Sequence, residues 1–341
     1  MGFHDKFTLL NYLYSSIVRP RDVVIKVTSI RSVRLSVDKK TWNPPKTPTF
    51  PTAFSPVNRI INLDVQSMLH RLGLLTTPVA ALGMSLAEHW AWIRYFYAFT
   101  AAPVDKTLTL APEYANLDPH QKTILSDDIG VAVPVHWIMD TLNIKEMPVD
   151  GVYFVKRMAH LLNKPLRRTN KRGPLKTPDF VMRDINGKWH VLECKGTQSS
   201  ISARNKQLSH NTKKGANGAV VQKTMIELRP EISGQRLGSG LFIGIQGGKE
   251  RSHLRVVDPD YAPLIDISKS EEGLLEDAII RSSVSKSLIL SGMISAGSAF
   301  GSPEGFLEFF DDVSPMRFRP PHQTADASLS GRWKLDKNCL K

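Results

Sequence analysis

Three polar residues near the middle of the chain, Asp179, Glu193 and Lys195, could together act on a phosphate ester. Glu193 and Lys195 stand two apart in an apolar segment, and residues two apart in a β-strand project from the same face. Two carboxylates on one face can bind Mg²⁺, which completes its shell with water and phosphate oxygens. The backbone carbonyl of Cys194 could add a further oxygen ligand. The metal would polarise the phosphoryl group and lower the pKa of a bound water, while Lys195 orients that water or stabilises the developing charge.

Asp179 joins this set only if a β-hairpin brings it there. Two stretches rich in β-branched and aromatic residues flank Asn186-Gly187, which is the strongest short-range hairpin signal. A two-residue turn would pair Asp179 with Cys194 and leave it on the face opposite Glu193. A three-residue loop with a bulge would pair it with Lys195 and gather the three polar groups. We expect the bulged register, or an equivalent bend at the preceding proline, because the chemistry requires one of them.

This order of residues resembles the PD-(D/E)xK nuclease superfamily, which has the restriction-endonuclease-like fold. Pro178-Asp179 matches the first half of its motif, and Glu193-Cys194-Lys195 matches the second half. The resemblance implies that Asp179 and Glu193 bind Mg²⁺, with Mn²⁺ as an alternative metal, and that Lys195 is the catalytic lysine. It also implies an α/β fold in which helices flank a mixed β-sheet.

Two further candidates come from the same resemblance. Many members carry an acidic residue on the helix before the core sheet, and we expect a helix over 127–142 with Asp128 as the better candidate. Capping by Ser126, with aspartates in the first helical turn, would explain the same residues, so both interpretations stay open. Some members have a glutamine on the helix after the second half-motif. Gln207 could be that residue, although an ordinary surface glutamine fits the position at least as well.

Basic residues crowd both sides of the candidate site. The chain has 45 Lys and Arg against 32 Asp and Glu, a formal net charge of +13, which favours a polyanionic partner. Contacts to a nucleic-acid backbone carry little base specificity. The residues expected to make such contacts are Arg167, Arg168, Lys171, Arg172, Lys176, Arg204, Lys206, Lys213 and Lys214.

The length of 341 residues suggests two domains or one large domain with an elaboration. We expect a mainly helical N-terminal region with some strands over 1–118, a nuclease-like domain over 119–315 and a basic tail over 316–341. The N-terminal region or the tail could bind a protein partner. With only two cysteines, no secretory signal and no apolar run of membrane-spanning length, a cytoplasmic protein without membrane attachment is expected.

The sequence therefore predicts a Mg²⁺-dependent endonuclease, with DNA favoured over RNA, that serves in restriction, phage defence or mobile-element DNA processing. The alternative is a nucleic-acid-binding or assembly subunit on the same fold that cuts little or not at all. The intact set of Asp, Glu and Lys favours the enzyme, because a binding module has no need of it. A homodimer is also open, since cutting both strands of a duplex requires two sites related by symmetry.

Overall fold

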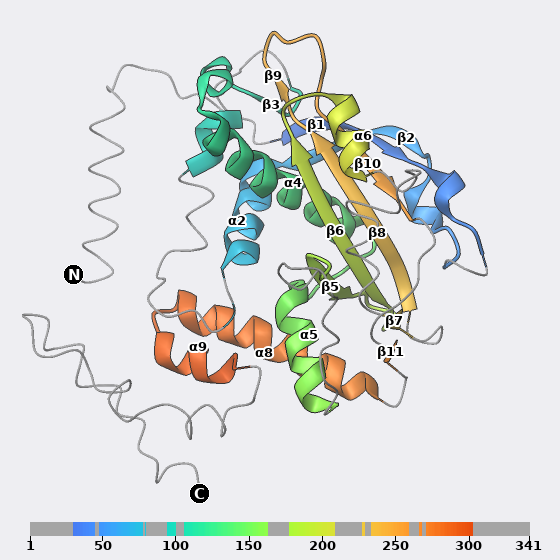
Figure 1. Cartoon of the computed structure of the whole chain (residues 1–341), viewed down its shortest axis with the longest axis vertical. Helices are drawn as coiled ribbons and strands as arrows, with labels where there is room; N and C mark the ends of the chain where they lie inside the picture. Colours follow the sequence, from blue (N-terminus) through green and yellow to red (C-terminus); the bar gives the residue numbers. More distant parts are fainter. Residues whose placement is uncertain are drawn as a thin grey trace, which may run out of the picture. The chain divides into compact units, whose positions relative to one another are not determined.

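A mixed sheet of seven strands runs through the residues that the computed structural model describes, which are 30–44, 48–77, 79, 94–99, 106–162, 177–208, 227–228, 233–258, 266–267 and 271–302. The strand order is β2-β1-β10-β8-β6-β5-β4 (Figure 1). The β1–β10 and β6–β8 pairs are parallel and the other pairs are antiparallel. The strands are β1 (Ile30–Val37), β2 (Asn58–Asp64), β4 (Val149–Asp150), β5 (Phe180–Arg183), β6 (Trp189–Thr197), β8 (Ser233–Phe242) and β10 (His253–Val257).

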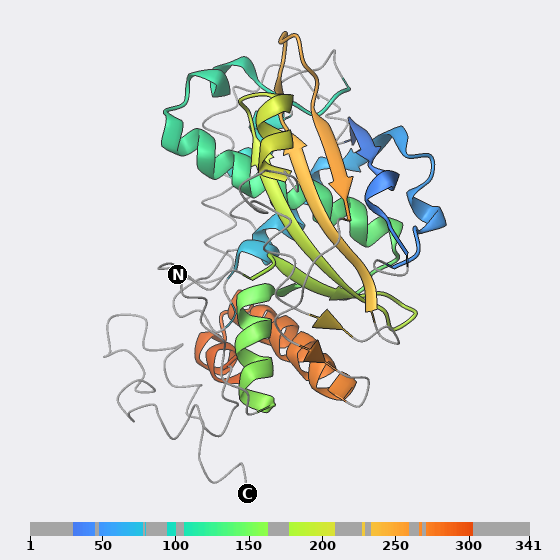
Figure 2. The same ribbon diagram turned by 45° about the vertical axis from the view of Figure 1, so that its right-hand side comes forward.

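Helices flank this sheet on both faces, so the expected mixed α/β class is confirmed. Figure 2 shows α4 behind the sheet, α6 in front of it, and α5 and α8 together near its lower end. None of the described helices has the length and apolar character that crossing a membrane requires. The α-helices are α2 (Val65–Thr76), α4 (Pro119–Thr141), α5 (Gly151–Leu161), α6 (Ile201–Leu208), α8 (Glu272–Leu290) and α9 (Ile294–Phe300), and residues 94–99 are also helical.

Short elements complete the described chain. Two small sheets pair β3 with β9 and β7 with β11, each in parallel. Their bounds, with those of three 3-10 helices, are β3 (Thr109–Leu110), β7 (Glu227–Leu228), β9 (Gly244–Ile245), β11 (Asp266–Ile267), η1 (Lys39–Thr41), η2 (Thr52–Phe54) and η3 (Pro112–Asn116).

Alternation along β6 divides the apolar side chains between two cores. Leu192 and Cys194 pack with apolar residues of α2 and α4 on one face of the sheet. Trp189 and Val191 point to the other face, where they pack with α5 and α8. Glu193 and Lys195 continue this second face, beyond the part that α5 and α8 cover.

Helix α4 begins earlier than the sequence suggested. The Asp118 carboxylate accepts hydrogen bonds from the N–H groups of His120 and Gln121, and Pro119 occupies the first turn, so these residues start the helix. Ser126 therefore lies inside the helix, where its hydroxyl donates to the carbonyl of Lys122. The expected start at residue 127 and the capping role of Ser126 were wrong, because Asp118-Pro119 supplies an earlier helix start.

Strands from the N-terminal region belong to the same sheet as the candidate site. β1 pairs with β2 on one side and with β10 on the other, and Leu35 lies opposite Leu254. The boundary expected between residues 118 and 119 therefore falls inside one sheet, and Thr28–Phe306 forms one compact unit. The tail expected over 316–341 lies outside the described residues.

Candidate active site

The β5–β6 hairpin has a register that differs from both expected registers. Val181 lies opposite Val191 and Phe180 opposite Leu192, so continuing the ladder places Asp179 opposite Glu193. The loop still has three residues, but it lies one residue earlier than expected, between Asp184 and Lys188. Directly opposite residues share a face, so the two carboxylates project to the same side.

The Asp184 side chain sets this register. Its Oδ1 accepts the N–H groups of Asn186 at 2.8 Å and of Lys188 at 2.9 Å, while its own N–H donates to the Lys188 carbonyl. Gly187 adopts φ 74°, which a glycine does without steric cost. An aspartate that bonds to the backbone two residues ahead fixes a turn by itself, and this signal competes with that of the Asn-Gly pair.

The three candidate catalytic side chains converge in the structure. The Asp179 N–H donates to Oε2 of Glu193 at 3.1 Å, and Oδ2 of Asp179 accepts the N–H of Cys194 at 2.7 Å. The Lys195 ammonium contacts Oε1 of Glu193 directly. The Glu193 side chain is fully buried, whereas the Lys195 side chain is 25% exposed. Solvent or a substrate can therefore reach the lysine directly, whereas Glu193 is shielded.

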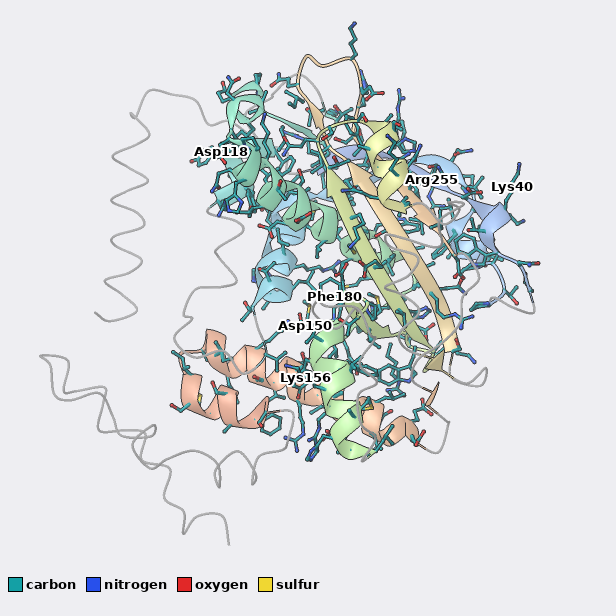
Figure 3. The ribbon with its side chains drawn as sticks, in the orientation of Figure 1. Lys40, Asp118, Asp150, Lys156, Phe180 and Arg255 are labelled. Atoms are coloured by element: carbon teal, nitrogen blue, oxygen red, sulfur yellow. The ribbon has the colours of Figure 1, made fainter. Side chains whose placement is uncertain are left out.

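Two close backbone contacts hold Asp179 and β6 in place. The N–H of Gly151, the first residue of α5, donates to the Asp179 carbonyl at 2.9 Å. A Cβ at Gly151 would lie 1.8 Å from the Pro178 carbonyl oxygen, so only glycine permits this approach. Figure 3 shows the neighbouring pair, Asp150 and Phe180, where the start of α5 meets β5.

Helix α4 reaches the same end of β6 through a second glycine contact. A Cβ at Gly196 would lie 1.7 Å from the Ser126 carbonyl oxygen, and one at Gly130 would lie 2.5 Å from the Cα of Gly196. The two backbones therefore touch, which places the residues that follow Ser126 beside the end of the Glu-x-Lys strand.

Asp127, rather than Asp128, has a charge interaction with Lys195 and Asp179. Burial raises the pKa of Asp127, the positive charge of Lys195 opposes that rise, and the charge of Asp127 in turn helps to raise the pKa of Asp179. Asp128 instead accepts a short hydrogen bond from the hydroxyl of Tyr95. The sequence-based choice of Asp128 depended on a wrong helix start, and knowing that the helix begins at Pro119 would have left both aspartates as candidates.

The ionised forms of Asp179 and Glu193 are disfavoured in this cluster, and a bound cation would stabilise them. Burial and then the neighbouring charge of Asp179 raise the pKa of Glu193 to about 8, although Lys195 opposes the rise. Burial also raises the pKa of Asp179. Burial disfavours the charge of Lys195, but Glu193 and Asp179 outweigh that effect, and its pKa is raised. The buried carboxylate of Glu193 and the partly buried one of Asp179 thus share a single adjacent ammonium group.

The remaining candidates have different positions. Gln207 lies on α6, and its amide Nε2 donates to the carbonyl of Gly196 at 3.4 Å, directly after Lys195. Arg204 is only 2% exposed and bonds to the carbonyl of His253, so it is not placed for direct contact with a ligand. Lys206 is exposed on the same helix. The other residues predicted to contact a nucleic-acid backbone lie outside the described residues: Arg167, Arg168, Lys171, Arg172, Lys176, Lys213 and Lys214.

The donor set fits a hard divalent cation that binds largely through water. No group of three or more His, Cys, Asp or Glu side chains in the described part of the chain is arranged to hold a metal ion. Asp179 and Glu193 alone provide two carboxylates, the number that Mg²⁺ typically takes from a protein. The Cys194 N–H donates to Asp179, and the carbonyl of Cys194 stays a predicted further ligand. A cation beside these carboxylates would stabilise their ionised forms.

Comparisons of the chain with family models, curated proteins and solved structures gave no match.

Proposed function

We propose that this protein is a metal-dependent nuclease that hydrolyses phosphodiester bonds, with DNA as the favoured substrate and the cytoplasm as its location. The observation that carries the proposal is the contact between Asp179, Glu193 and Lys195 at one end of β6. A purely structural hairpin would gain nothing from placing a second carboxylate beside the buried Glu193, because the charge of Asp179 raises the pKa of Glu193 and burying charge costs stability. We further propose that the sheet and its helices are a variant of the restriction-endonuclease-like fold.

The side chains divide the chemistry between them. Asp179 and Glu193 would hold Mg²⁺, which when bound polarises the phosphoryl group and lowers the pKa of a water ligand. Lys195, held by Glu193 and partly exposed, would orient the attacking water or stabilise the charge that develops on the phosphate. Gln207 and Asp127 lie near the same strand end and would position solvent and shape the local field.

The test is incubation of supercoiled plasmid DNA with the full chain in Mg²⁺ and in EDTA. We expect nicking or linearisation in Mg²⁺ only. Glu193→Gln and Lys195→Ala should each lower the cutting rate by at least about 100-fold, the scale on which one catalytic group contributes. Matched RNA and DNA oligonucleotides in the same assay identify the substrate class.

Two exposed residues serve as matched controls. Glu146→Gln and Lys156→Ala remove the same kinds of charge away from the cluster, and both should leave cutting unchanged. Cutting that survives both site substitutions would overturn the assignment. Binding without cutting, in a wild-type chain that folds and takes up Mg²⁺, would instead support a nucleic-acid-binding or assembly subunit.

A further inference from the structure

A row of side chains on one face of the sheet leads away from Lys195. Lys195 lies opposite Gly240, Gly240 opposite Arg255, and Arg255 opposite Ser36. Laterally paired residues project to the same face, so Lys195, Arg255 and Ser36 share one face of the sheet, on which α6 packs over Gly240 between Lys195 and Arg255. In the adjacent row, His253 lies opposite Arg34 on that surface.

Helix α6 places a third arginine, the buried Arg204, beside the two on this face. A Cβ at Gly240 would lie 2.8 Å from Leu208 and 2.9 Å from Arg204, so the glycine allows α6 to lie directly on β8. Arg204 then donates to the amide oxygen of Asn205 at 2.8 Å, and Arg255 donates to the same oxygen at 3.2 Å. Two guanidinium groups therefore share one neutral acceptor. We call Arg34, Ser36, Arg204, Asn205 and Arg255 the sheet-face cationic patch.

Among the described residues, the negative charges that lie near the patch do not balance its positive charge. Arg255 pairs with Asp38 at 2.7 Å, and the exposed Glu250 lies close enough to Arg204 to favour its charge. Arg34 is exposed. His253 senses the resulting positive field, because burial and then Arg204, Arg34 and Arg255 lower its pKa to about 4. An imidazole kept neutral among three arginines indicates a surface that is suited to an anion.

We propose that the sheet-face cationic patch binds the phosphate backbone of the nucleic acid whose reacting phosphate lies at Lys195, an inference that rests on the proposed function. Arg34 and Arg255 are the direct phosphate contacts. The buried Arg204 positions Asn205 and adds positive charge beneath the surface. Strands lie about 4.8 Å apart, so Arg255 lies about 10 Å and Ser36 about 14 Å from Lys195 across the sheet.

The experiment measures binding without cleavage. Fluorescence anisotropy of a labelled DNA duplex of about 20 base pairs in EDTA gives the dissociation constant of the full chain between about 50 and 200 mM salt. Arg34→Gln and Arg255→Gln should each weaken binding several-fold and reduce the slope of log K against log salt by about one. Arg34→Lys should retain the wild-type slope, because it keeps the charge.

Lys156→Gln is the matched control, because Lys156 is exposed on α5, at the other end of the described unit from Arg255 (Figure 3). It should leave the slope unchanged. The patch assignment is wrong if Arg34→Gln behaves like Lys156→Gln, and equally if polyglutamate competes with the duplex at equal charge. Arg255→Gln also loses the Asp38 pair, so the exposed Arg34 keeps the test valid if that variant fails to fold.

The two proposals can fail separately. If the wild-type chain binds DNA through Arg34 but never cuts in Mg²⁺, the patch proposal holds and the nuclease proposal is refuted. If the wild-type chain cuts DNA but Arg34→Gln binds DNA with the same salt slope as wild type, the nuclease proposal holds and the patch proposal is refuted.

Discussion

At the scale of single residues, the carboxyl group of Glu193 should make the metal-free protein sensitive to pH. Its pKa is about 8 in the folded chain against an ordinary value of 4.5, so the unfolded chain releases a proton that the folded chain keeps. The free energy of unfolding should therefore fall as pH rises from about 5 to about 8, by roughly 2 to 4 kcal/mol. Thermal unfolding in EDTA across this range measures the effect.

Comparison with Glu193→Gln separates this group from the others that titrate. The variant should lack this part of the decline, and its advantage over wild type should be greatest near pH 8 and vanish near pH 5. Mg²⁺ should raise the unfolding temperature of wild type but not of the variant. Parallel curves for the two proteins in EDTA would contradict the assigned pKa.

The neighbouring aspartates of α4 should have separable roles. Asp128→Asn weakens the hydrogen bond from the Tyr95 hydroxyl, so it should lower the free energy of unfolding by about 1 to 3 kcal/mol. Asp127→Asn removes a charge beside Lys195 and Asp179, so it should leave stability within about 0.5 kcal/mol and weaken Mg²⁺ binding. Chemical unfolding and metal-binding calorimetry on both variants test the division, which fails if the two effects are exchanged.

At the scale of elements, the contact between α4 and β6 depends on two glycines. Gly196→Ala would place a methyl group 1.7 Å from the Ser126 carbonyl oxygen, a backbone atom that cannot move independently. We expect the free energy of unfolding to fall by about 3 kcal/mol or more. Gly273→Ala is the control, because a Cβ at this position in α8 meets nothing within 4 Å, and it should be neutral or slightly stabilising. Equal stabilities of the two variants, measured by urea unfolding, would refute the close contact.

The hairpin shows how much of the site could be predicted from the sequence. Residue type and spacing identified both strands and the face that Glu193 and Lys195 share. The register could not be read from the Asn186-Gly187 pair, because the Asp184 carboxylate competes for the same backbone N–H groups and moves the loop by one residue. Asp179 does lie on the same face as Glu193, as expected, but it lies opposite Glu193 rather than opposite Lys195.

At the scale of the whole molecule, the sheet depends on strands that come from opposite ends of the described chain. β1 covers the outer edge of β10, so a chain that starts at residue 119 would expose the backbone of β10 and apolar residues such as Leu254 and Val256. We expect that fragment to aggregate or to unfold without cooperativity. A fragment over Thr28–Phe306 should unfold in one cooperative step, because it contains the complete unit.

Calorimetry and limited proteolysis of the two fragments provide the measurement. Cooperative unfolding of the shorter fragment would restore the boundary at residue 118. The sequence does not reveal the pairing across that boundary, since a parallel pair such as β1–β10 joins segments that are far apart in the sequence and leaves no turn signal between them. The same long-range pairing hid the sheet-face cationic patch, whose arginines come from β1, β10 and α6.

The turn made by Asp184 has a consequence for how this protein can evolve. Surface loops ordinarily accept insertions and deletions freely. Here a gain or loss of one residue between Asp184 and Lys188 would shift β5 against β6 and turn Asp179 away from Glu193. Selection for activity should therefore fix the length of this loop as strictly as it fixes the carboxylates, and natural variants should differ there by substitution rather than by length.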